Sequence, residues 1–178
     1  MIKGSLSRCA VLTCCLWLPA AAWTDAITEQ GVTIPREVQV DGTTLELVGH
    51  GVARYARIFR VSVAALYAPP NRATDPLHEQ DVARQLRITY LRDVAADDIR
   101  EAKETALERQ HSADALAPYK ERLEHFSALY QDVSDGDEYV YRYNPPTEMS
   151  RLALNGDALG SVEGAGFARV YLGIWLGE

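Results

Sequence analysis

Arg54 and Ser62 are two polar residues in an otherwise apolar stretch, and their types suit binding of an anion. The stretch 49–67, GHGVARYARIFRVSVAALY, has apolar residues on both faces toward its end, which is typical of a strand covered on both sides. Buried polar groups need partners or a ligand. Arg54 could bind a planar carboxylate with two hydrogen bonds, and Ser62 could add a hydroxyl donor.

Each of these two residues also has a purely structural interpretation. Arg54 could form a surface ion pair of little stability value, as exposed arginines of acidic proteins do. Ser62 could be a buried hydroxyl that bonds to the backbone. We therefore treat both as candidate ligand contacts, and we assign no catalytic residue.

The histidines do not predict a metal site, because they fall in different elements and lack the i, i+4 or His-x-His spacing of ligands. They are His50, His78, His111 and His125. His50 stands between two glycines beside Arg54, and we expect it to lie in a turn. Fingerprints for a serine nucleophile, a phosphate loop or a dinucleotide are missing from the sequence, so we expect neither a metal nor a cofactor.

The N-terminal segment 1–22 has the pattern of a secretory signal peptide. Two basic residues precede a short apolar run at 9–18, and Pro-Ala-Ala-Ala follows at 19–22. The run is shorter than the roughly 20 residues that a membrane-spanning helix needs. We expect cleavage after Ala22, a periplasmic or secreted location, and one domain formed by residues 23–178.

All three cysteines, Cys9, Cys14 and Cys15, lie in this segment. The mature chain would therefore have no disulfide, zinc–thiolate site or cysteine nucleophile. Attachment of a lipid at Cys14 or Cys15 is the alternative fate of the segment. Leu12-Thr13 before Cys14 argues against it, since such sites favour a small residue at that place.

The chain is acidic, with a formal net charge of −7, and loss of Lys3 and Arg8 with the leader makes it more negative by two. An acidic protein without a basic run repels nucleic acid and anionic membrane surfaces. We expect no nucleic-acid partner, and no transmembrane segment after signal cleavage. The partner that Arg54 suggests is a small amphipathic anion.

Strands are predicted from alternating apolar residues and from turn residues between them. Asp41-Gly42 and Asn155-Gly156 suit the tight turns of hairpins. The predicted strands are 37–40, 43–48, 57–67, 85–92, 138–143, 150–154 and 158–162. Helices are predicted at 97–110 and 118–131, and a short amphipathic helix closes the chain after Gly166.

The apolar faces of these helices and of one strand predict where the core lies. Residues 97–110 offer an alanine-rich face, Ile99, Ala102, Ala106 and Leu107. The next predicted helix, 118–131, has a stripe of bulky apolar residues, and strand 138–143 places three tyrosines on one side. Both groups could line a ligand site. Core packing is the interpretation that we favour for both. The order of elements predicts an α+β domain, with helices layered on one face of a mostly antiparallel sheet.

Four blocks resemble the bacterial secreted proteins of the chalcone isomerase superfamily. They are GHGVARYARIFRVSVAALYAPP, ITYLRDVAADDIREA, DVSDGDEYVYRYNP and LALNGDALGSVEGAGFARVYLGIWLGE. The resemblance implies a large antiparallel sheet backed by helices, with an apolar cleft between them. The plant enzymes of this superfamily close a chalcone to a flavanone with an arginine and a threonine, which Arg54 and Ser62 match, and with a helix-borne tyrosine and asparagine that residues 97–110 lack.

Three functions follow from this resemblance. Non-catalytic members of the superfamily bind fatty acids, with an arginine on the carboxylate, so the first is a binder of a fatty-acid-like or aromatic acid. The second is an isomerase of a chalcone-like enone, an intramolecular lyase. The third is a structural or envelope-associated protein with a vestigial pocket, which a cleft filled by bulky side chains would favour.

Overall fold

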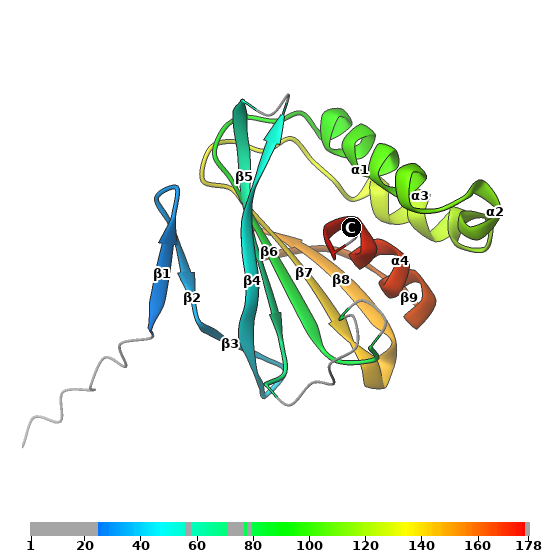
Figure 1. Cartoon of the computed structure of the whole chain (residues 1–178). Helices are drawn as coiled ribbons and strands as arrows, with labels where there is room; N and C mark the ends of the chain where they lie inside the picture. Colours follow the sequence, from blue (N-terminus) through cyan, green and yellow to red (C-terminus); the bar gives the residue numbers. More distant parts are fainter. Residues whose placement is uncertain (1–24, 56–57, 71–76, 78–79, 177–178) are drawn as a thin grey trace, which may run out of the picture.

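A computed structural model describes residues 25–55, 58–70, 77 and 80–176 of the chain. The predicted signal peptide, residues 1–22, lies outside the described residues, and so do its cysteines. Two sheets and a layer of helices make up the described part (Figure 1).

The main sheet has seven antiparallel strands that follow one another in sequence order. Each strand therefore pairs with the next strand of this sheet in the chain, although residues 91–137 separate two of them. The strands are β3 (Glu37–Val40), β4 (Thr43–Tyr55), β5 (Phe59–Ala68), β6 (Arg84–Tyr90), β7 (Glu138–Asn144), β8 (Met149–Leu154) and β9 (Asp157–Glu163). These strands correspond to the segments in which apolar residues alternate in the sequence. The two predicted hairpins, β3 with β4 and β8 with β9, are confirmed.

Two of the turns show why their residue types fit. Asp41 and Gly42 have φ angles of 49° and 79°, and Asn155 and Gly156 have 51° and 91°. A two-residue turn with both φ angles positive matches the twist of the strands that it joins. Glycine occupies the second place because it adopts positive φ without a steric penalty.

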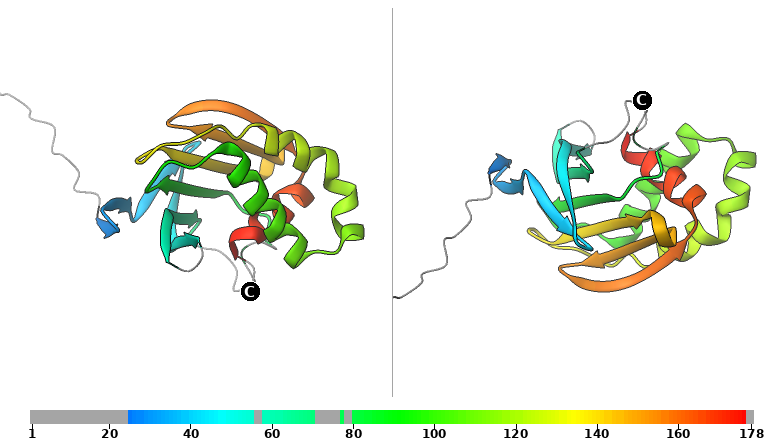
Figure 2. Two further views of the ribbon diagram at one scale, coloured as in Figure 1. Left: turned by 90° about the horizontal axis from the view of Figure 1, so that it is seen from above. Right: turned by 90° about the horizontal axis from the view of Figure 1, so that it is seen from below.

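The helices cover one face of the main sheet (Figure 1). They are α1 (Ala96–Gln110), α2 (Ala113–Leu116), the 3₁₀ turn η2 (Ala117–Tyr119), α3 (Lys120–Ala128) and α4 (Ala165–Leu176), with a further 3₁₀ turn η3 (Pro145–Thr147) between β7 and β8. Figure 2 shows that the sheet curls and that α4 lies in its hollow, with α1 and α3 beside it. Phe167 and Leu172 of α4 are fully buried there. The predicted α+β fold class, with helices on one face, is confirmed.

The opposite face of the sheet carries a second, smaller sheet that the sequence analysis did not predict. It is a hairpin of β1 (Ala26–Glu29) and β2 (Val32–Pro35). Ile34 packs there in a separate apolar cluster with Leu45 of β4 and with Val63 and Tyr67 of β5. β5 is thus an interior strand with apolar contacts on both faces, as its sequence indicated.

Two expectations about local structure were wrong. His50 lies in strand β4 and not in a turn, because the backbone of 49–53 pairs with β5 through a register shift at Leu47/Gly49. The face of α1 is also rotated from the alanine-rich one. The buried residues are Ala96, Ile99, Lys103 and Leu107, whereas Ala102 is exposed.

Candidate functional site

The structure places Arg54 in solvent, near the outer end of β4. The residue is exposed, and its backbone lies opposite Arg60 of β5 after a second register shift. The expectation of a guanidinium in a dry cleft therefore differs from the structure, because Arg54 lies on the same face as Arg60, which contacts Gln30 in the β1–β2 turn and not the helices. Contact between Arg54 and a ligand stays a prediction.

Ser62, in contrast, is buried, with 3% of its surface exposed. Its backbone lies between Ala53 of β4 and Tyr90 of β6. Directly opposed residues of an antiparallel pair share a face, and Tyr90 belongs to the core under the helices. Ser62 therefore faces the helical layer, and its role as a ligand contact also stays a prediction.

Small residues of β4 and β5 form a shelf on this helix-facing side. Gly49 lies opposite Leu66 and Gly51 opposite Ala64, and both partners pack in the core under the helices. A Cβ atom added to either glycine would meet no atom of the described residues within 4 Å. Both glycines are exposed, so this part of the sheet presents backbone and small side chains.

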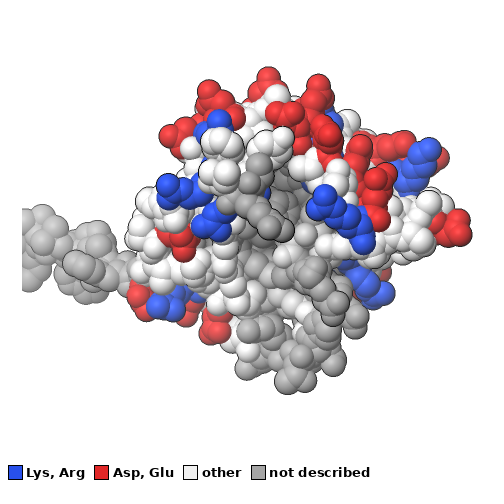
Figure 3. All heavy atoms as spheres, turned by 45° about the horizontal axis from the view of Figure 1, so that its top comes forward, with Lys and Arg blue, Asp and Glu red and all other residues white. Residues whose placement is uncertain are grey.

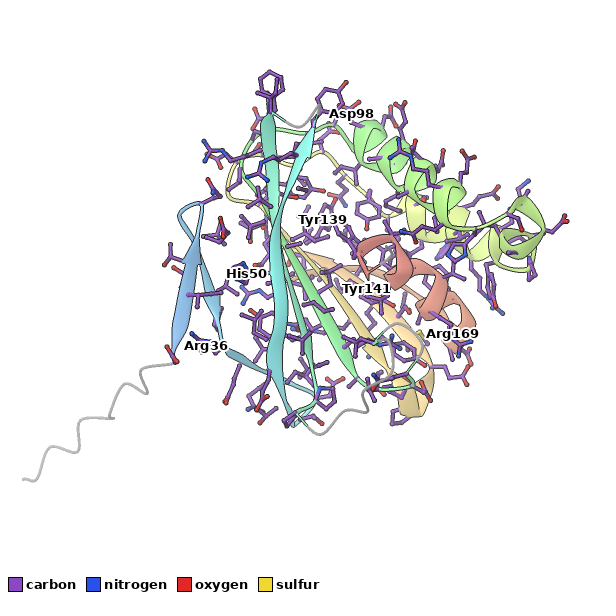
Figure 4. The ribbon with its side chains drawn as sticks, viewed as in Figure 1. Arg36, His50, Asp98, Tyr139, Tyr141 and Arg169 are labelled. Atoms are coloured by element: carbon purple, nitrogen blue, oxygen red, sulfur yellow. The ribbon has the colours of Figure 1, made fainter. Side chains whose placement is uncertain are left out.

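Between the main sheet and the helices, aromatic rings fill the interior. The ring of Phe126 on α3 lies 6.0 Å from that of Tyr141, 5.3 Å from that of Phe167 and 5.0 Å from that of Tyr171. Figure 4 shows Tyr139 and Tyr141 projecting from β7 into this layer. Edge-to-face pairs of this kind add to the energy of burial, and the core interpretation of the tyrosines and of the α3 stripe is confirmed.

Lys103 is the charged side chain beneath α1. Only 5% of its surface is exposed, its Nζ donates to Ser127 Oγ at 3.0 Å, and Nζ lies 4.0 Å from the ring centre of Tyr130 and 5.6 Å from that of Tyr171. Burial lowers the pKa of Lys103 from its ordinary 10.5 to about 7. The amine is therefore near its titration point at neutral pH.

The hydroxyls around Lys103 remain neutral. Tyr130 and Tyr171 bond to each other through their OH groups, and burial raises the pKa of both phenols well above the ordinary value. Tyr139 OH donates to the carbonyl of Gln131 at 3.0 Å and accepts from its amide at 2.8 Å. No carboxylate in the described ranges lies within ion-pair distance of Lys103. Burial lowers its pKa most, the nearby carboxylate of Glu104 raises the pKa, and the guanidinium of Arg100 lowers it.

This arrangement can hold an anion. A buried amine flanked by hydroxyl groups gains a strong, charge-assisted hydrogen bond when a carboxylate reaches it, and perturbed pKa values of buried groups gather at functional sites. The sequence analysis missed Lys103. The signal was its spacing of four residues from both Ile99 and Leu107, which places it on their stripe of the helix.

Two hollows of the described surface lie elsewhere. One is a small, partly open space of about 10 Å³ under the β1–β2 hairpin, lined by Tyr67, Arg87 and Glu138 among others. The other is an open groove of about 640 Å³ between α3 and β9, lined by charged residues that include Glu121, Arg122 and Glu163. In the parts of the chain that the structure describes, acidic, histidine and cysteine residues form no group of three suited to a metal ion. Nor is any helix there long and apolar enough to cross a bilayer.

The protein belongs to the chalcone isomerase-like family, whose sequence model matches residues 26–178. A crystal structure of a fatty-acid binding protein from Arabidopsis thaliana has a similar fold, with a TM-score of 0.68 and 17% sequence identity over 86% of this chain and 90% of that chain. A comparison with curated proteins returned no match. The predicted family is therefore confirmed, and the structural likeness confirms the fold.

Proposed function

We propose that the protein is a non-catalytic binding protein for a small amphipathic carboxylate, such as a fatty acid or an aromatic acid. Three features support this proposal: the family, the fatty-acid binding of the structural relative, and the buried amine of Lys103. The last carries most weight. An ammonium group with 5% exposure and no carboxylate partner in the described residues is costly unless a ligand balances it.

In this proposal, the ligand's carboxylate binds Lys103 and Ser127, and its apolar part lies along the shelf of Gly49, Gly51 and Ala64. Ser62 is a secondary candidate at the other end of that shelf. Arg54 is a weaker candidate, because its strand partner Arg60 contacts Gln30 in the β1–β2 turn and both arginines therefore lie on the opposite face of the sheet. The aromatic layer must rearrange for a ligand to reach Lys103. Because edge-packed rings can change rotamer without opening the sheet, we assign this movement to the side chains beneath α1.

The test is a binding screen on delipidated protein. Native mass spectrometry and thermal shift should detect saturated acids of 8 to 18 carbons and aromatic acids, whereas the methyl esters should bind more weakly by about tenfold or more, because they lack the charge. Lys103→Met should abolish this preference. Lys120→Met removes an exposed lysine of α3 whose partner is Glu124, and it is the matched control.

Proton uptake provides a second measurement. A bound carboxylate favours the charged amine and raises the pKa of Lys103 above about 7. At pH 8 the complex should therefore take up close to one proton, measurable by calorimetry in buffers of different ionisation enthalpy. Equal affinity for acids and esters, or binding without proton uptake in the wild type, would reject Lys103 as the carboxylate partner. Arg54→Ala and Ser62→Ala then test the secondary candidates.

A structural role is the second candidate function, because one observation favours it. The space between sheet and helices is filled by rings in contact, which is what a vestigial pocket would look like. If none of the acids in the screen binds, the structural role is favoured. Loss of absorbance of a chalcone, with dependence on Arg54, would instead indicate the isomerase.

We also propose a periplasmic or secreted location, which rests on residues 1–22. Expression of the full chain in a bacterial host, followed by mass measurement of the exported protein, should give a chain that begins at Trp23. A product that keeps residues 1–22 in the membrane fraction would contradict cleavage.

A further inference from the structure

Large apolar side chains gather in solvent at the tip of the β4–β5 hairpin. Three large apolar residues of the described ranges are exposed to solvent: Tyr55, Ile58 and Phe59, with 73%, 75% and 52% of their surfaces accessible. Tyr55 lies opposite Phe59 in the strand pair, and the amide of Ile58 donates to the carbonyl of Tyr55 at 3.2 Å. The three residues therefore lie together at this end of the hairpin.

We call the group of Tyr55, Ile58 and Phe59 the hairpin tip. Arginines surround it. Arg54 and Arg60 are exposed and lie opposite each other just behind it. The guanidinium of Arg92 lies 5.7 Å from the ring centre of Phe59. Arg60 also donates to Gln30 in the β1–β2 turn, which braces the hairpin. The tip is thus apolar and basic, although the whole chain has a formal net charge of −7.

Acidic side chains occupy the neighbouring surface. α1 begins four residues after Arg92, and Asp97 and Asp98 are exposed in its first turn. Figure 3 shows acidic side chains gathered along one edge of this face, while basic side chains stand beside uncharged surface. The average charge of the chain therefore hides a local basic region.

We propose that the hairpin tip docks the protein on a membrane surface that contains anionic lipids. Aromatic and aliphatic side chains enter the interfacial region of a bilayer, and arginines pair with lipid phosphates. A protein partner fits less well. A stable protein interface needs roughly 800 Å² per partner, and a convex tip of three apolar residues offers far less, whereas lipids can close around it.

The acidic surface then sets the orientation. An anionic membrane repels α1 and its carboxylates, so contact is restricted to the tip, with the sheet standing away from the lipid. Salt should weaken the contact, because the arginine–phosphate attraction is screened. This proposal does not depend on the identity of any ligand of the helix-covered site.

The test measures partitioning onto vesicles of phosphatidylcholine with 30% phosphatidylglycerol. We use the chain from residue 23 onward, which contains every described element and excludes the apolar run at 9–18. Replacing Tyr55, Ile58 and Phe59 with serine should lower the partition coefficient by about tenfold or more, and so should Arg54→Glu, Arg60→Glu and Arg92→Glu together. The matched control changes three exposed arginines outside the tip to Glu, namely Arg109, Arg151 and Arg169. It should lower partitioning by less than threefold.

A site-specific probe locates the contact directly. All cysteines of the chain lie in residues 1–22, so Ile58→Cys provides a single labelling site in the shorter chain. An environment-sensitive dye at this position should gain fluorescence on vesicles, whereas the same dye at Asp114→Cys on the exposed face of α2 should not.

Five outcomes would overturn the proposal. The first three are no vesicle binding by the wild type, equal loss in the tip variants and the arginine control, and equal binding to vesicles of phosphatidylcholine alone. The other two are a dye response at both sites and self-association that depends on the tip and occurs without vesicles. Circular dichroism and thermal melting identify any variant that fails to fold, and the labelled Ile58→Cys chain then decides.

Discussion

Replacing Lys103 with methionine should stabilise the protein, although it removes a hydrogen bond. Burial lowers the pKa of Lys103 from 10.5 to about 7, and each pH unit corresponds to about 1.36 kcal/mol. The charged side chain therefore costs about 5 kcal/mol of folding free energy. Loss of the hydrogen bond to Ser127 lowers the stability of the variant by about 1 kcal/mol. At pH 6 we expect a net gain of about 4 kcal/mol, or a rise in Tm of about 8 to 16 °C.

The pH dependence is the sharper part of this prediction. Between pH 7 and 10.5 the unfolded chain keeps the proton on Lys103 and the folded chain does not, so the stability of the wild type should rise with pH in this window. The methionine variant lacks this gain. The advantage of the variant should therefore shrink by about 1.4 kcal/mol per pH unit above 7 and reach about 1 kcal/mol at pH 9.

Urea unfolding at pH 6, 7, 8 and 9, followed by circular dichroism, measures these differences. Lys120→Met is the control, because Lys120 is exposed and forms a surface pair with Glu124 at 3.8 Å; its effect should stay within about 0.5 kcal/mol at every pH. The reasoning is refuted if the difference between wild type and Lys103→Met is constant across this range, or if the variant is less stable at pH 6.

Three further substitutions test the packing. Phe126→Ala should cost about 3 to 5 kcal/mol in urea unfolding, because the ring is 1% exposed and touches three others; a loss below 1 kcal/mol would contradict the aromatic layer. Arg84→Met should lower the free energy of unfolding by about 3 kcal/mol or more and speed proteolysis near 77–82, because the guanidinium donates to the carbonyls of Leu77, Gln80 and Val82. Unchanged cleavage there would mean that these hydrogen bonds do not hold the segment in place. Gly42→Ala should cost about 1 kcal/mol because φ is 79°, and equal or greater stability would argue against the positive φ.

Most of the architecture could be predicted from local patterns, because each strand pairs with the next one in sequence. Asp41-Gly42 and Asn155-Gly156 set two hairpins, and alternation on 138–143 placed the tyrosines inward. In a sheet whose strands pair in sequence order, correct local predictions nearly give the topology. The β1–β2 hairpin escaped because its short strands are joined by Gln30-Gly31 and not by the Asp-Gly or Asn-Gly pair of a strong turn signal. Gln30-Gly31, with φ angles of 52° and 85°, was the available signal.

The candidate site was harder to predict, because it depends on tertiary contacts. A lysine on an amphipathic helix normally points to water, so Ala102 and Ala106 seemed to mark the inner face. The rotation of α1 is set by its packing on α4, and there Lys103 lies inward with Ile99 and Leu107. The exposure of Arg54 depends on which face of the sheet the helices cover, which residue types alone do not reveal.

Register shifts between β4 and β5 bear on how the molecule avoids associating with its own copies. β3 has only four residues and pairs with Thr43–Glu46, so from Val48 onward one side of β4 has no strand partner among the described residues. An open strand of that length is a template for intermolecular pairing. The shift at Leu47/Gly49 adds Val48 to β4 and bends this strand, and the shift at Ala53/Arg54 adds Val61 to β5, so the ladder is not continuous. A deletion that straightened β4 would leave the core intact and yet lower solubility at high protein concentration.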